Sequence, residues 1–84
     1  MSKKHQKILE QIFQNPVQSS IAWKDIEAML VSLGAEISEG NGSRVRIALN
    51  DVRAVFHRPH PQKEALRYRV KDARLFLQKI GIQP

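Results

Sequence analysis

The apolar positions in the first part of the chain recur every three or four residues in two segments, which is the period of an amphipathic helix. They are Ile8, Leu9, Ile12 and Phe13 in the first segment, and Ile26, Met29, Leu30 and Leu33 in the second. Pro16 ends the first pattern, because proline disfavours the helical conformation in the residue before it. Gly34 ends the second pattern, and Ser19 or Ser20 is expected to cap its beginning. The pattern therefore predicts two helices before residue 35.

Beyond Gly34 apolar and polar positions alternate, which is the period of a β-strand. Residues 35–39 predict a short strand, residues 40–42 a turn, and residues 44–49 and 52–57 two longer strands joined by Asn50 and Asp51. With this two-residue turn, one face pairs Leu49 with Val52, Ile47 with Ala54 and Val45 with Phe56, and the other pairs Ala48 with Arg53, Arg46 with Val55 and Arg44 with His57. The first set is apolar throughout. The hairpin is therefore expected to have one core face and one cationic face.

The last part of the chain predicts one more helix. Two prolines in residues 58–61 exclude a ladder strand, so this segment is expected to be an extended loop. From about Arg67, apolar residues recur at helical spacing and end at Gly81; they are Val70, Ala73, Leu77 and Ile80. The element order predicts an α+β fold, in which a three-stranded antiparallel sheet has helices packed on one face. Residues 1–84 are expected to form a single domain.

The charge of the chain is concentrated in its second half. Residues 1–40 hold four basic and five acidic residues, whereas residues 41–84 hold ten basic and three acidic ones, so the second half carries all of the net charge of +6. Such an asymmetry favours a polyanionic ligand such as RNA. Cysteine is absent, and no apolar run approaches the roughly 20 residues of a membrane span. We therefore expect a soluble cytoplasmic protein without disulfides, thiolate metal sites or a membrane partner.

The cationic face of the hairpin supplies candidate binding and catalytic residues. The residues expected to contact RNA phosphates are Ser43, Arg44, Arg46, Arg53 and Arg58. Arginine suits this role because its planar fork of donors matches phosphate oxygens. His57 is the first candidate for proton transfer and His60 the second. Attack by the 2′-hydroxyl of RNA needs only proton transfer and charge stabilisation, so we expect neither a metal nor another cofactor. The alternative is that His57 is only a strand-end residue beside a polyanion-binding face.

Five short features follow one another in the region that starts at Trp23 and closes at the helix end at Gly81. They are Leu33-Gly34-Ala35 at a helix end, Gly42-Ser43 before a strand, Phe56 near a strand end, His60-Pro61 in a loop, and Lys79-Ile80-Gly81-Ile82 at the end of the last helix. In this order they resemble the HicA toxins of bacterial HicA–HicB toxin–antitoxin modules. The resemblance implies a fold like the double-stranded RNA-binding domain, ribosome-independent endonuclease cleavage of messenger RNA, and inhibition by a HicB-type antitoxin. It also implies that residues 1–16 are an N-terminal helical extension of the HicA-like domain.

One position departs from the family pattern. HicA toxins generally carry their catalytic histidine directly after the Gly-Ser pair, and this chain has Arg44 there. An arginine stays protonated and cannot act as a general base. Three interpretations remain open: the chain binds RNA without cleaving it, it has lost activity and keeps its antitoxin contact, or His57 supplies the missing proton-transfer group. In a further alternative, the basic face docks an acidic protein and RNA is not a ligand.

Overall fold

The structure is a computed structural model that describes residues 2–59 and 63–84. Its elements are α1 (Lys3–Ile12), α2 (Trp23–Ser32), β1 (Glu36–Glu39), β2 (Arg44–Leu49), β3 (Val52–His57) and α3 (Arg67–Ile80). The strands form one antiparallel sheet in the order β1-β2-β3. The predicted α+β fold and its order of elements are therefore confirmed.

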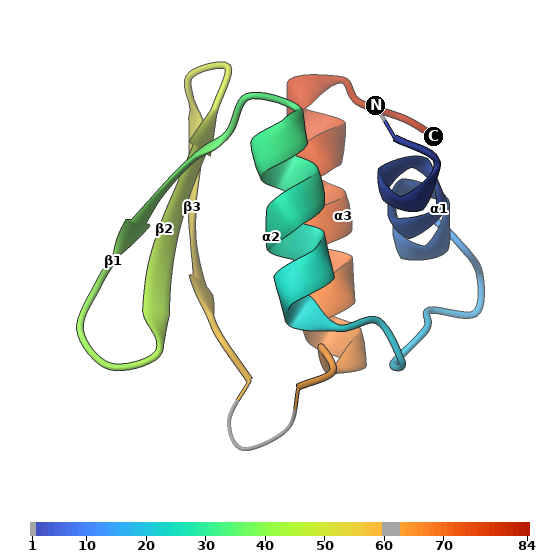
Figure 1. Cartoon of the computed structure of the whole chain (residues 1–84), viewed down its shortest axis with the longest axis horizontal. Helices are drawn as coiled ribbons and strands as arrows, with labels where there is room; N and C mark the ends of the chain where they lie inside the picture. The colour runs from blue at the N-terminus through green and yellow to red at the C-terminus, as the bar shows by residue number, and fades with distance from the viewer. Residues whose placement is uncertain (1, 60–62) are drawn as a thin grey trace.

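The helices all lie on one side of the sheet (Figure 1). Helices α2 and α3 lie between the sheet and α1, so the molecule has a sheet layer, a middle layer of two helices, and α1 on the far side. Three aromatic rings join the sheet to the middle layer: the ring centroid of Phe56 lies 5.4 Å from that of Trp23 and 6.0 Å from that of Phe76. Such pairs add to the free energy gained from burying the rings. One face of the sheet is thus committed to the core, and the other is left for ligands.

The hairpin has the predicted register, with Leu49 opposite Val52 and Arg44 opposite His57. Asn50 and Asp51 adopt φ angles of 51° and 65°, the pair of left-handed conformations that a type I′ turn requires. This turn matches the twist of the strands and fixes which residues face each other. Val45 and Ile47 consequently lie fully buried on the helix side.

The beginning of α2 differs from the prediction. Neither Ser19 nor Ser20 caps this helix; the capping position is Ala22, which makes no side-chain hydrogen bond to the helix. Both serines lie several residues before the start of the helix, because Ile21 and Ala22 pair with the segment that precedes α3. The Trp23 amide donates to the Lys63 carbonyl at 3.0 Å, so a distant backbone group satisfies the helix end.

Helix α1 is anchored to the body of the fold by Arg74 of α3. The Arg74 guanidinium donates to the Ile12 carbonyl at 2.9 Å, to the Gln14 carbonyl at 2.7 Å, and to the Asn15 side-chain oxygen at 3.2 Å. Carbonyls at a helix end lack intrahelical partners, and here a side chain from α3 supplies them. Leu9 and Ile12 of α1 are buried in the common core. The N-terminal helix therefore shares a core with α2 and α3.

Candidate nucleic-acid interface

The side chains on the solvent side of the sheet form an exposed surface, which we call the outer sheet face. Its members are Glu36 and Ser38 of β1, Arg44, Arg46 and Ala48 of β2, and Arg53, Val55 and His57 of β3. Along β2 these residues alternate with buried ones, because successive side chains of a strand point to opposite faces. Three arginines therefore gather on a surface that no helix covers.

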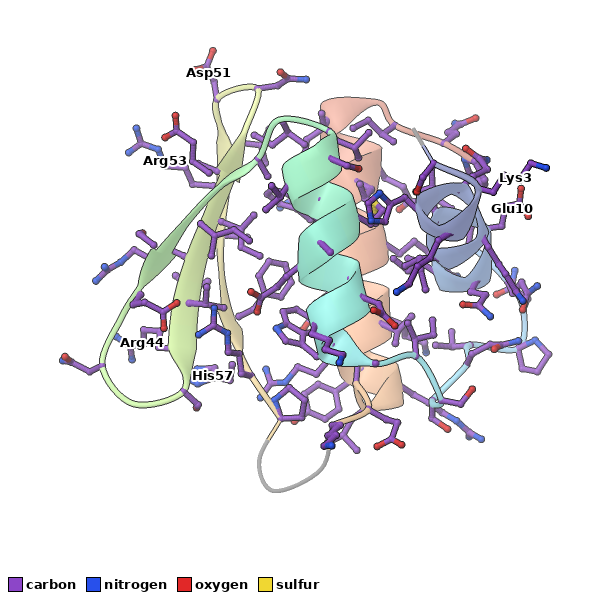
Figure 2. All side chains as sticks on the ribbon, in the orientation of Figure 1. Lys3, Glu10, Arg44, Asp51, Arg53 and His57 are labelled. Atoms are coloured by element: carbon purple, nitrogen blue, oxygen red, sulfur yellow. The ribbon has the colours of Figure 1, made fainter. Side chains whose placement is uncertain are left out.

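Arg44 of β2 and His57 of β3 lie directly opposite each other on the outer sheet face. The Arg58 amide donates to the Ser43 carbonyl at 2.9 Å, so residues 43 and 58 are a hydrogen-bonded pair. The next pair along an antiparallel ladder is then a non-hydrogen-bonded one, with Cα atoms about 4.5 Å apart and side chains close together. That pair is Arg44 and His57. Figure 2 shows both at the end of the hairpin opposite Asp51, with Arg53 nearer the turn. One phosphate can therefore reach both side chains.

A shallow depression of about 590 Å³ lies on the outer sheet face. Arg46 and Arg53 line it together with the small side chain of Ala48, and Glu36 and Ser38 line its β1 side. The sequence analysis did not place Glu36 and Ser38 here, because it assigned no partner to the first strand. The alternation of Glu36, Ile37 and Ser38 already indicated that Glu36 and Ser38 share one face of the strand. The observed register places Ser38 opposite Arg46. The depression is therefore open, with Arg46 and Arg53 on its β2 and β3 side and one carboxylate, Glu36, on its β1 side.

Arg58 directly follows β3, and its side chain is engaged by two carboxylates. Its Nε and Nη2 atoms donate to the two carboxylate oxygens of Glu27 in α2, at 2.8 and 3.0 Å. Its Nη1 atom donates to Oε1 of Glu39 in β1 at 2.6 Å. The Glu27 carboxylate also accepts a hydrogen bond from the indole nitrogen of Trp23. Arg58 therefore connects α2, β1 and the end of β3, whereas the sequence analysis grouped it with the phosphate-binding arginines.

This network holds the end of the hairpin at which Arg44 and His57 lie. Its ion pairs shift two pKa values: the hydrogen bond from Arg58 lowers the pKa of Glu39, and the hydrogen bonds to Glu27 and then Glu39 raise the pKa of Arg58. A carboxyl whose pKa is lower in the folded state stabilises the fold above its unfolded pKa. That contribution is lost as the pH falls through the folded pKa of Glu39. At neutral pH the network is therefore complete.

Replacing Arg58 with alanine is expected to lower the free energy of unfolding by about 1 kcal/mol, because Glu27 would keep a charge with one partner fewer. The expected loss of stability is small because the Arg58 side chain is 36% exposed, so solvent screens its ion pairs. Thermal unfolding should show a fall in Tm of about 4–8 °C. Arg58→Lys should recover only part of this loss, since lysine lacks the bidentate fork. Exposed Arg67 is the matched control, and an equal loss in Arg67→Ala would contradict the prediction.

Of the two remaining candidate residues, the structure describes Ser43 but not His60. Ser43 is exposed at the start of the hairpin, next to Gly42, whose φ of 63° makes the tight turn into β2. His60 lies outside the described residues. Across residues 2–59 and 63–84, no group of three or more histidine, aspartate or glutamate side chains is placed to hold a metal ion. In the same residues, no helix has both the length and the apolar content that a bilayer crossing needs.

The comparison with protein families decides what kind of domain this is. The model of the HicA toxin of bacterial toxin–antitoxin systems matches residues 23–82. The chain belongs to the HicA toxin family. The HicA match begins at the first residue of α2 and runs past the end of α3, so α1 precedes it. A search of curated proteins and a search of solved structures found no match.

Membership in the HicA family assigns this chain to a toxin–antitoxin system. A HicA toxin acts within a toxin–antitoxin system, so this chain is a toxin component and has an antitoxin partner. The five-element order α2-β1-β2-β3-α3 fills the matched HicA region. Within it, the position after the Gly-Ser pair holds Arg44, and the residue directly across the ladder is His57. His57 of β3 therefore lies beside Arg44 of β2 within the matched region.

Proposed function

We propose that this HicA-family chain is a toxin that binds RNA on its outer sheet face and cleaves it without a metal ion. The observation that carries the proposal is the direct opposition of Arg44 and His57 on an exposed cationic surface. Arg46 and Arg53 extend the positive charge along the hairpin, which suits a chain of phosphates. The RNA substrate would be messenger RNA in the cytoplasm, and the inhibitor a HicB-type antitoxin. Ser43, at the entrance to β2, is a further candidate contact.

The proposed reaction is an internal transfer within the RNA. The neutral imidazole of His57 accepts the proton of a 2′-hydroxyl as its oxygen attacks the adjacent phosphorus. A new bond forms between phosphorus and the 2′-oxygen, and the bond to the 5′-oxygen breaks. The imidazolium then returns the proton to the departing 5′-oxygen. Arg44 stabilises the charge that builds up on the phosphoryl oxygens. The products are a 2′,3′-cyclic phosphate and a 5′-hydroxyl end, and no other reactant is needed.

Purified protein incubated with single-stranded RNA in the presence of EDTA tests this proposal. We expect cleavage to continue after chelation and to leave 2′,3′-cyclic phosphate ends, which mass spectrometry of the fragments identifies. Expression of the chain alone is expected to arrest bacterial growth. Intact RNA together with normal growth would reject the cleavage part, and RNA binding would then be judged separately by its dependence on salt concentration.

The second candidate function is a HicA-type module that binds RNA or an antitoxin without cleaving RNA. Arg44 favours it, because arginine cannot take a proton from a hydroxyl at neutral pH. The Arg44→His variant separates the two functions. If His57 already transfers protons, this variant removes the guanidinium that stabilises the phosphoryl oxygens and slows cleavage, whereas a non-cleaving wild type that gains cleavage in Arg44→His supports the second function.

A further inference from the structure

Strand β3 is a free edge of the sheet. The strand order β1-β2-β3 leaves its far side unpaired. Hydrogen-bonded and non-hydrogen-bonded pairs alternate along an antiparallel ladder, and residues 43 and 58 form a hydrogen-bonded pair. Arg53, Val55 and His57 belong to non-hydrogen-bonded pairs, so their backbone N–H and C=O groups point away from β2. Three residues thus present N–H donors and C=O acceptors in the spacing that another strand would need.

The two edges of the sheet differ in how they are protected. Strand β1 has four residues and carries Glu36 and Glu39, and short, charged edges resist pairing with other chains. Strand β3 has six residues, keeps an uninterrupted register with β2, and contains no proline. A long regular edge is a liability for a monomer unless another chain covers it. The β3 edge therefore has the properties of a pairing site.

A groove with apolar and charged walls runs beside this edge, between β3 and α3, and has a volume of about 210 Å³. Its apolar lining includes Val52, Ala54 and Val55 of β3 and Leu75 and Phe76 of α3, and its charged lining residues are Arg53, Asp72 and Lys79. Leu75 of α3 and Val55 of β3 are each 55% exposed, and both line this groove. A strand paired with β3 would direct every second side chain toward this groove, because strand side chains alternate between faces.

We propose that the β3 edge receives an extended segment of an acidic protein as a fourth strand, with the apolar side chains of that segment in the groove against Leu75. The charges select an acidic partner. The outward side chains of β3 are Arg53, Val55 and His57, so acidic groups opposite the first and last of these make favourable cross-strand pairs. Lys79 adds a positive charge to the groove, and Asp72 is the negative charge among its described lining residues.

A second copy of the chain fits this edge less well. Antiparallel self-pairing centred on Val55 would set Arg53 of each copy opposite His57 of the other, and each copy carries a net charge of +6. Because the family of the chain implies an antitoxin partner, we assign the acidic segment to the antitoxin. Resting on the proposed function, the added strand would bring carboxylates beside His57 and Arg53, where they would compete with RNA phosphates. Strand addition would then neutralise the toxin.

Amide hydrogen exchange tests the proposal on the complex of this chain with a HicB-type antitoxin, purified after co-expression. We expect the amides of Arg53, Val55 and His57 to exchange at least about tenfold more slowly in the complex than in the free chain, since paired amides must open before they exchange. Unchanged exchange at all three amides, or the absence of any complex, would overturn the proposal.

Two variants locate the contact within the edge and the groove. Leu75→Glu is expected to weaken antitoxin binding about 100-fold, because it places a carboxylate in an apolar contact facing an acidic strand. Val31→Glu is the control, since Val31 is 52% exposed on α2 and lies outside the groove. Val55→Pro removes an outward N–H and leaves the β2–β3 ladder bonds intact, so it should also weaken binding about tenfold or more. Binding of both variants at wild-type strength would reject the edge as the docking site.

The RNA assays separate this proposal from the proposed function. Leu75 is not a member of the outer sheet face, but Arg53 lines the same groove, so an uncharged replacement separates the two activities. Folded Leu75→Gln, checked by circular dichroism, should bind RNA as the wild type does and escape neutralisation. If the wild type binds no RNA but its β3 amides are protected by the antitoxin, the proposed function fails and the docking site stands. If the wild type binds RNA but the antitoxin does not protect its β3 amides, the RNA-binding part of the proposed function stands and the docking site is rejected.

Discussion

Replacing His57 with alanine is expected to lower the rate of RNA cleavage by about 10²–10⁴-fold, the usual contribution of a positioned general acid or base. The side chain is exposed at the end of β3 and opposite Arg44, so its removal leaves no cavity in the core. Thermal stability should therefore change by less than about 0.5 kcal/mol. Cleavage of a fluorescently labelled RNA under single-turnover conditions measures the chemical step directly.

His5 is the matched control for this substitution. It lies in α1, on the far side of the middle helix layer from the outer sheet face (Figure 1). His5→Ala should leave the cleavage rate within about twofold of wild type. RNA affinity of His57→Ala should fall only slightly, because the arginines provide most of the attraction to phosphate. Cleavage at the wild-type rate in His57→Ala would remove this histidine from the mechanism and leave His60 as the remaining candidate.

Replacing Arg44, Arg46 and Arg53 together with glutamine is expected to weaken RNA binding by about 10³-fold at low salt. A charge-assisted hydrogen bond contributes about 1.5 kcal/mol, close to tenfold in affinity, and three are removed. The slope of log affinity against log salt concentration should become shallower by about 2, because single-stranded RNA releases about 0.7 counterions for each phosphate neutralised. Fluorescence anisotropy over a salt series measures both quantities.

Lys3, Lys4 and Lys7 provide a control with the same loss of charge. All three are exposed on α1, away from the sheet. Their replacement with glutamine lowers the net charge equally but should reduce affinity by less than about fivefold, through long-range attraction alone. Equal losses in the two triple variants would show that net charge, and not the outer sheet face, attracts RNA.

The hairpin illustrates what a local pattern can predict. Asn50 and Asp51 tolerate left-handed conformations, the flanking positions alternate, and the two facts together specify every pair from Leu49 and Val52 to Arg44 and His57. The end of α3 is equally local, because Gly81 adopts a φ of 87° directly after the last helical residue. Family membership likewise followed from short features in order, and the match over residues 23–82 bears it out.

Arg58 illustrates what a local pattern leaves open. Its neighbours in the chain suggested a phosphate contact, but its partners Glu27 and Glu39 lie 31 and 19 residues away. Likewise, the partner of the α2 amide at Trp23 is the carbonyl of Lys63, which no serine-capping pattern indicates. Both sets of contacts join segments that lie far apart in the chain.

The sequence by itself determined the elements, the register of the hairpin and the cationic character of one sheet face, because turns and side-chain alternation act between residues near in the chain. Only the tertiary structure decided that two carboxylates engage Arg58, that β1 completes the outer sheet face, and that β3 and α3 enclose a groove at the edge of the sheet. These features depend on where distant elements meet. Long-range packing decides which elements come into contact. It therefore also decides which carboxylates lie close enough to pair with a given arginine.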